Sequence, residues 1–360
     1  MKKLKVLFFG PYSGPLTGQS VSFIETYNSF KDAKILVDST KFKRNKFFNT
    51  LYCLFLLPIV FSFQNFTVVY FTCTRSKLGV LKDIELLLLS KLFNKKVVNH
   101  LHGADFKNFY HNSGKIKSLI HYCYEQIDLS IVLLPTMKAQ FSDFTNMKIE
   151  VIENCYSTEM DSYKVDFEAK NKQILYLSNL IYSKGIFIFL EAAEQLLKED
   201  LDIIIKIAGL PMGDDFISEK DTGLQFQESY NDLKIKYPDR IFYLGGVQGV
   251  EKAKVLLESS LFVLPTFYKT EAFPITIIEA MRFGNAIITT NHNYLPDIIN
   301  LNNGKLVNTN SSSDLIEKVR SLFSNPNELF RIQQYNMEKS MLKYSPNAYN
   351  LAIHRVLKNI

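Results

Sequence analysis

Two acidic residues, Glu271 and Glu279, lie in a stretch whose residue types could bind a phosphorylated ligand. Glu271 precedes a helix that the sequence predicts from Pro274 to Phe283, and Glu279 lies inside that helix. Proline is typical of the first helical position, because its missing N–H group has no helical partner to lose there. The first backbone N–H groups of a helix have no acceptor within the helix, so they can bind a phosphate. Here these are the N–H groups of Phe273, Ile275 and Thr276. Two carboxylates beside bound phosphates could hold hydroxyl groups, and a nucleotide diphosphate sugar has that layout.

Apolar runs of strand length flank this helix, so the unit is strand, loop, helix, strand. The pattern Glu271-x7-Glu279, with Ala280-Met281 and Gly284 in register, resembles the signature of glycosyltransferase family 4. The resemblance implies a retaining sugar transferase of the GT-B fold, in which Glu271 lies near the donor sugar and Glu279 holds the ribose hydroxyls. It places further donor-binding groups at Phe273, Pro274, Ile275 and Thr276. An ordinary amphipathic helix with one exposed acid is the alternative.

A second informative stretch, Ser178–Gly185, precedes apolar residues at helical spacing. It resembles the family's G-R-L-x-x-x-K-G segment, whose arginine and lysine bind the donor diphosphate. Lys184 matches the lysine, whereas Asn179 stands at the arginine position and is expected to contact the donor in its place. The spacing predicts Lys184 in the first turn of a helix, where a cation opposes the helix dipole by about 0.3–1 kcal/mol. A bound anion would reverse that cost; a fraying surface lysine is the alternative.

His102 follows a predicted strand and resembles the family's histidine beside the donor sugar. His100 and His102 share one face of a strand, so a metal pair is an alternative, but the spacing offers no third ligand. A hydrogen-bonded structural histidine is the other alternative. The resemblance therefore implies three catalytic residues, which are His102, Lys184 and Glu271.

Two glycine-bearing loops complete the expected donor site. Gly18 ends a turn between a strand and a helix, and it resembles the family loop that borders the donor phosphates. A plain surface loop is the alternative there, because the spacing matches no phosphate-binding fingerprint. Gly246 and Val247 follow a strand and resemble the position where backbone groups meet the nucleotide base.

Strand-like runs alternate with helical patterns along the chain, which predicts an α/β protein with parallel, doubly wound sheets. The expected plan is GT-B, with two Rossmann-like domains facing across a cleft. We expect an acceptor-binding domain over residues 1–160, a linker over 161–172 and a nucleotide-sugar-binding domain over 173–343. The resemblance also implies that a last helix, 347–360, packs back on the first domain.

The composition excludes several classes of protein. A net charge of +6 is mildly basic, so nucleic acid is not an expected partner. The cysteines form no C-x-x-C pair, which favours buried thiols over disulfides or a zinc site; they are Cys53, Cys73, Cys123 and Cys155. Asp200-x-Asp202 precedes a strand and reads as solvated turn residues. No metal and no other cofactor is expected, since Lys184 and helix amides would neutralise the diphosphate.

The most hydrophobic run, Phe47–Phe63, is interrupted by Pro58 and is shorter than the about 20 residues that span a bilayer. It predicts a buried helix that ends near Pro58. Basic residues alternate with phenylalanines before it, which is typical of contact with an anionic membrane; they are Lys41, Lys43, Arg44 and Lys46. A solvated charged face is the alternative. Because Met1-Lys2-Lys3 leads directly into a strand and shows no signal peptide, we expect a cytoplasmic protein. Contact through the basic residues would place it at the inner face of the cytoplasmic membrane.

These expectations combine into a metal-independent, retaining hexosyltransferase. Its donor would be a nucleotide diphosphate sugar, with UDP-sugars preferred, and its acceptor a glycan or a lipid-linked molecule. Richness in Lys, Asn, Ile, Phe and Tyr is typical of an AT-rich bacterium, which suggests surface polysaccharide synthesis. One alternative is a GT-B nucleotide-sugar epimerase, which would need no acceptor. The other is a non-catalytic partner subunit. The charged or polar site residues argue against it, because such a subunit would have lost them: His102, Lys184, Glu271 and Glu279.

Overall fold

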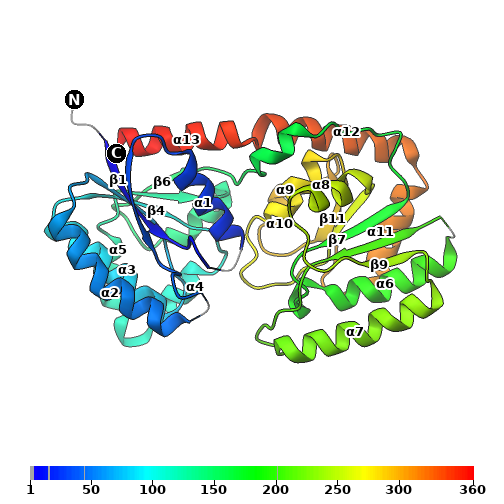
Figure 1. Cartoon of the computed structure of the whole chain (residues 1–360), viewed down its shortest axis with the longest axis horizontal. Coiled ribbons are helices and arrows are strands. Elements are labelled where there is room, and N and C mark those ends of the chain that lie inside the picture. Colours follow the sequence, from blue (N-terminus) through cyan, green and yellow to red (C-terminus); the bar gives the residue numbers. More distant parts are fainter. Residues whose placement is uncertain (1–3, 15–16, 44, 201) are drawn as a thin grey trace. The chain divides into compact units, whose positions relative to one another are not determined.

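In the computed structural model, which describes residues 4–14, 17–43, 45–200 and 202–360, the strands form two six-stranded sheets (Figure 1). Every pairing between neighbouring strands is parallel. The chain divides into a first unit of 1–154 and 347–360 and a second unit of 155–346. Two doubly wound α/β units are what the sequence predicts.

The sheet of the first unit has the strand order β2-β1-β3-β4-β5-β6. Its strands are β1 (Lys5–Gly10), β2 (Ala33–Asp38), β3 (Val68–Thr72), β4 (Lys96–His100), β5 (Leu129–Val132) and β6 (Lys148–Val151). Strand β3 is buried along its whole length, because helices cover both faces of a parallel sheet. The strand order reverses between β1 and β3, so the loops after these two strands leave the sheet side by side.

The sheet of the second unit has the order β12-β11-β10-β7-β8-β9. Its strands are β7 (Gln173–Leu177), β8 (Ile204–Ala208), β9 (Ile241–Tyr243), β10 (Leu261–Leu264), β11 (Ala286–Thr290) and β12 (Gly304–Val307). Here the order reverses between β7 and β10, which pair through Leu261 and Ile174. Ligands of open parallel sheets bind at such a switch point, beyond the carboxyl ends of the strands.

Helices connect the strands within each unit. The first unit contains α1 (Gly18–Ser29), α2 (Lys46–Phe63), α3 (Lys77–Leu92), α4 (Phe106–His111), α5 (Lys117–Tyr124) and nearly all of α13 (Pro346–Asn359). The second unit contains α6 (Ile186–Glu199), α7 (Glu219–Lys236), α8 (Gly249–Glu258), α9 (Ile275–Arg282), α10 (Leu295–Ile298), α11 (Ser312–Phe323) and α12 (Pro326–Lys343). Helix α13 is joined to the first unit by the Tyr349 hydroxyl, which lies 2.7 Å from the Thr26 hydroxyl.

The boundary between the units precedes the position expected at residue 160, and residues 161–172 are part of the second unit. Lys170 shows why this polar segment is not a free linker. Its ammonium group donates hydrogen bonds to the carbonyl oxygens of Leu257 at 3.0 Å and Ser259 at 2.5 Å. These carbonyls end helix α8 and need donors. Burial there lowers the pKa of Lys170 to about 7.

Helix α2 differs from the buried helix that was expected to end near Pro58. It continues to Phe63, and the Gln64 amide still donates to the Val60 carbonyl at 2.9 Å. Proline removes one helical hydrogen bond but leaves the neighbouring ones. Only one side of α2 is buried, while large apolar side chains on the other side are exposed: Phe47, Phe48, Leu51, Phe55, Ile59 and Phe63. Because α2 is apolar on every side, its periodicity does not indicate which side faces the core.

By length and composition, α2 is the one helix within the described part of the chain that could cross a membrane. All four cysteines are buried and form no disulfide, as the sequence predicts.

Candidate functional site

The loops that follow β7 and β10 meet at the switch point of the second sheet. The loop after β7 contains Lys184, and the loop after β10 contains Glu271. Their backbones are joined directly, because the Phe267 amide donates to the Ser183 carbonyl at 2.7 Å. The fold therefore brings together two of the three residues predicted to be catalytic.

Lys184 lies at the end of a 3-10 turn, η4 (Tyr182–Lys184), and not in the first turn of α6 as expected. Gly185 separates the two elements with a φ of 79°, a left-handed conformation that glycine adopts without strain. A Cβ atom at Gly185 would lie 2.1 Å from the Pro265 carbonyl oxygen. Glycine at this position therefore allows the Lys184 turn to pack against the β10 loop.

The Lys184 ammonium group lies 3.4 Å from a Glu271 carboxylate oxygen and 5.7 Å from the centre of the Tyr268 ring. Both charged side chains are largely buried, with 19% of Lys184 and 9% of Glu271 exposed. An ammonium group has three N–H donors, so Lys184 can bind Glu271 and an anion at the same time. A partly buried cation at a switch point is suited to stabilising negative charge that develops on a ligand.

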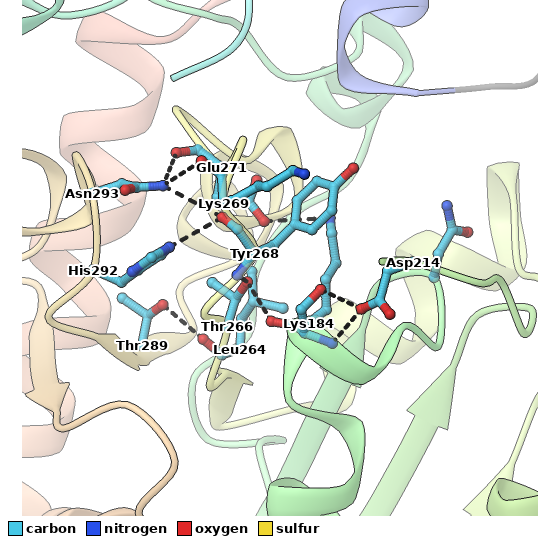
Figure 2. Close-up of polar contacts among 12 residues, drawn as sticks. Lys184, Asp214, Leu264, Thr266, Tyr268, Lys269, Glu271, Thr289, His292 and Asn293 are labelled. Carbon is cyan, nitrogen blue, oxygen red and sulfur yellow. Dashed lines mark hydrogen bonds and ion pairs between the residues drawn. The ribbon is translucent and has the colours of Figure 1, made fainter. Parts of the chain in front are cut away.

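The β10 loop is held by two residues that follow β11 (Figure 2). The Asn293 amide group donates to the carbonyls of Lys269 and Glu271, both at 3.1 Å, and the His292 Nε2 group donates to the Tyr268 carbonyl at 3.1 Å. Asn293 has a φ of 46°, and asparagine tolerates this left-handed conformation better than most residues. Sequence reasoning missed both residues, and the only local signal was an asparagine just past a strand.

Glu279 lies on helix α9 and is buried in the second unit. Its carboxylate lies 2.5 and 2.6 Å from the ammonium group of Lys252, which belongs to α8. Glu279 is 3% exposed, and burial raises the pKa of this carboxyl although Lys252 opposes the effect. Lys252 was not predicted as a site residue, because nothing in its local sequence distinguishes it from a surface lysine.

Helix α9 lies within the predicted range but is one residue shorter at each end: Pro274 is its capping residue and Ile275 its first residue. Gly284 follows the end of the helix at a φ of 66°, as the sequence predicts. The first amides of a helix have no acceptor within the helix, which leaves those of Ile275 and Thr276 suited to an anion. Phe273 is buried and packs edge-on against Tyr344 at 5.5 Å between ring centres. This packing fixes the approach of the chain to the helix.

The remaining donor-site predictions lie in loops or at a helix start. Gly246 and Val247 lie between β9 and α8, the helix that contains Lys252. Asn179 lies between β7 and η4, and its carbonyl accepts a hydrogen bond from the Tyr176 hydroxyl at 3.4 Å. Gly18 is the first residue of α1 in the first unit, next to the capping residue Thr17.

His102 follows β4 at the carboxyl edge of the first sheet. Its ring is tilted by 37° against the His100 ring, with 4.0 Å between centres. Both of its ring nitrogens are buried without a hydrogen-bond partner among the described residues. Burial holds the pKa of His102 well below its usual value, and His100 and Arg75 add to the effect. Arg75 is itself paired, because its guanidinium lies 2.5 Å from the Asp105 carboxylate.

The part of the chain that the structure describes contains no group of three or more His, Cys, Asp or Glu side chains that could hold a metal ion. Asp200 ends α6 and lies 2.8 Å from the Lys172 ammonium, and 81% of the Asp202 side chain is exposed. These two acids are turn residues, as expected.

Asp214 supports the Lys184 turn from the loop after β8 (Figure 2). Its carboxylate accepts hydrogen bonds from the Ser183 amide at 2.9 Å and hydroxyl at 2.6 Å, and from the amides of Phe216 and Ile217. Burial alone would raise the pKa of Asp214, but these hydrogen bonds outweigh it and lower the pKa. Asp214 therefore connects two loops of the site as a charged acceptor.

We expect Asp214→Ala to lower the free energy of unfolding by about 1–3 kcal/mol, because partly buried donors of two loops lose a charged acceptor. The difference from the parent should shrink as the pH falls below about 4, since a group with a lowered folded-state pKa loses its contribution when it is protonated. Urea denaturation of both proteins at several pH values measures this. Asp214→Asn, which keeps an acceptor oxygen, should lose less; equal losses in the two variants would contradict a role for the acceptor.

The glycosyl transferases group 1 family model matches residues 158–339 of this chain. Anabaena Alr3699/HepE in complex with UDP has a similar structure, with a TM-score of 0.77, 14% identity, and 99% of this chain and 100% of that chain covered. The same protein in complex with UDP-glucose gives a TM-score of 0.75, 16% identity, and coverage of 99% and 100%. Sucrose-phosphate synthase from Thermosynechococcus elongatus has a TM-score of 0.76 and 14% identity, with 99% of this chain and 98% of that chain covered. No curated protein sequence matches the chain at a significant level.

Proposed function

The chain belongs to the group 1 glycosyl transferases and has the GT-B fold, and we propose that it transfers a hexose from a UDP-sugar to an acceptor hydroxyl with retention of the anomeric configuration. The observation that carries this proposal is the Lys184–Glu271 pair, 3.4 Å apart at the switch point of the second sheet. The UDP and UDP-glucose complexes of the structurally similar Anabaena protein support the choice of nucleotide.

The chemistry follows from where charge develops. The bond between the anomeric carbon and the diphosphate oxygen breaks, so the sugar ring gains positive charge and the diphosphate gains negative charge. Lys184 and the amides at the start of α9 stabilise the diphosphate as it departs. Glu271 orients the sugar through its hydroxyl groups, and Glu279 holds the ribose.

Retention requires the acceptor oxygen to bond to the anomeric carbon on the face that the diphosphate leaves. The acceptor proton then passes to the departing phosphate oxygen, so no side-chain base is required. For His102 of the first unit we propose contact with the donor sugar: a neutral imidazole there fits the lowered pKa. Gly18, Asn179, Gly246 and Val247 complete the proposed donor contacts.

The proposed acceptor is a glycan or a lipid-linked molecule in bacterial surface polysaccharide synthesis. A lipid-linked acceptor fits a protein at the inner face of the cytoplasmic membrane, where Lys41, Lys43 and Lys46 would contact anionic lipid. These three lysines are exposed, and Arg44 lies outside the described residues.

A donor screen tests the proposed reaction. We expect calorimetry to show UDP binding at least about tenfold tighter than GDP, and labelled UDP-sugars to be hydrolysed or transferred in the presence of EDTA. Proton NMR of the product should show the anomeric configuration of the donor. Tighter binding of GDP, or product formation without an acceptor as an isomeric UDP-sugar, would contradict the proposal.

A further inference from the structure

Helix α2 presents an apolar stripe to solvent. Its outward residues repeat at every fourth position, which places them on one side of a helix: Phe47, Leu51, Phe55, Ile59 and Phe63. Phe55 is 73% exposed and Phe63 is 80% exposed. A surface helix of a globular protein normally turns charged or polar side chains outward, yet the sequence from Phe47 to Phe63 contains no charged residue. An exposed apolar surface of this kind indicates a binding surface.

Helix α3, which packs against α2 (Figure 1), extends this surface. Its exposed leucines recur at helical spacing: Leu78, Leu81, Leu88 and Leu92. Glu85 lies at the same phase of the helix, and burial raises the pKa of its carboxyl to about 7. Its negative charge is therefore reduced near neutral pH. The α2 and α3 stripes together form what we call the apolar face.

Basic side chains border the apolar face. Lys41, Lys43 and Lys46 precede or begin α2 and are exposed, and the stretch from Lys41 to Phe63 contains no acidic residue. Phe42 and Phe48 lie among these lysines with 6.3 Å between ring centres, and both are about half exposed. Aromatic and aliphatic side chains bordered by lysines match the chemistry of an anionic bilayer, with acyl chains below and charged headgroups above.

The opposite side of α2 is attached to the first unit. Asn49, Cys53, Leu57 and Phe61 are buried there. The Asn49 side chain also accepts a hydrogen bond from the Phe42 amide at 2.8 Å and donates one to the Lys43 carbonyl at 3.1 Å. A helix that crossed the bilayer would have to abandon this packing. The geometry therefore favours a helix that lies along the membrane surface.

We propose that the apolar face of α2 and α3 inserts into the headgroup region of an anionic membrane, with α2 parallel to the membrane plane and the three lysines bound to lipid phosphates. This proposal rests on the membrane contact proposed above and adds the surface that makes it. It does not depend on the proposed reaction, because it concerns the first unit without any donor.

Flotation of the full chain with vesicles, in the absence of nucleotide, tests this proposal. We expect binding to vesicles of equal parts phosphatidylcholine and phosphatidylglycerol, weaker binding to phosphatidylcholine alone, and a loss of binding as salt is raised. Phe55→Glu combined with Phe63→Glu should weaken binding at least about tenfold. Both positions are exposed, so the melting temperature and the affinity for UDP should stay at the parent values.

Matched control and charge variants separate the alternatives. Ile235→Glu combined with Leu342→Glu changes two apolar side chains of the second unit that are each 81% exposed, and this variant should bind vesicles like the parent. Lys43→Glu combined with Lys46→Glu should weaken binding to anionic vesicles and remove its salt dependence. The proposal is overturned if the parent binds neither vesicle or if the phenylalanine variant binds as well as the parent. It is also overturned if the parent self-associates without lipid and the phenylalanine variant does not, because the face would then bind a second copy.

Discussion

We expect Lys184→Ala to lower kcat for sugar transfer by about 10²–10³-fold, or about 2.7–4 kcal/mol of transition-state stabilisation. The reason is geometric and electrostatic. Only 19% of the Lys184 side chain is exposed, and the turn that contains it is fixed to the β10 loop and to Asp214. A fixed and partly desolvated ammonium group needs little reorganisation when charge develops on the departing diphosphate. Steady-state rates with a labelled UDP-sugar measure the effect.

The interpretation of this variant requires two comparisons. Lys236→Ala removes a lysine of the same unit that forms an exposed ion pair with Glu194 at 2.6 Å, and its kcat should stay within about twofold of the parent. Lys184→Ala also leaves the buried Glu271 carboxylate without its cation, and an uncompensated buried charge destabilises the fold. Glu271→Gln, alone and combined with Lys184→Ala, removes that unpaired charge. If Lys184→Ala lost only about twofold in rate, or if its whole loss followed a lowered melting temperature, Lys184 would not act on the diphosphate.

Much of the fold could be predicted from the sequence, because strands of parallel sheets are buried on both faces and appear as apolar runs. Lys184 and Glu271 could be predicted to share a site for a related reason. Both follow strands, and loops that follow neighbouring parallel strands leave the sheet at the same edge. The start of α9 could also be predicted, since Pro274 and Gly284 mark the two ends of that helix.

Contacts made only in the folded chain could not be predicted in this way. Asp214, His292 and Asn293 hold the site loops by hydrogen bonds to backbone groups that lie more than 20 residues away in the sequence, and the local sequence does not indicate such partners. Lys252 shows the same limit, because its partner Glu279 belongs to another helix. The exposure of α2 was missed for a different reason: a helix that is apolar all round is read as a core helix by periodicity alone.

Breaking the Lys252–Glu279 ion pair should lower the free energy of unfolding more than any other change considered above. Taking away one partner of a buried ion pair leaves an uncompensated charge, and the typical loss is about 3–5 kcal/mol. We therefore expect Lys252→Met to lower the free energy of unfolding by about that amount at neutral pH. Urea denaturation without nucleotide measures it. A double variant, Lys252→Met with Glu279→Gln, removes both charges and should recover most of the loss.

The pH dependence identifies the cause of that loss. Burial already raises the pKa of Glu279, and Lys252 opposes this rise, so Lys252→Met should raise the folded-state pKa further. When the folded-state pKa of a carboxyl is raised, the fold is most stable below the unfolded pKa of about 4.3. The fold then loses stability as the pH increases and the buried carboxyl ionises. The deficit of Lys252→Met relative to the double variant should therefore be small near pH 4 and grow as the pH rises above the unfolded value. A deficit that does not change with pH would indicate lost packing of the lysine chain, and Glu279 would then not depend on Lys252 to remain ionised for the ribose.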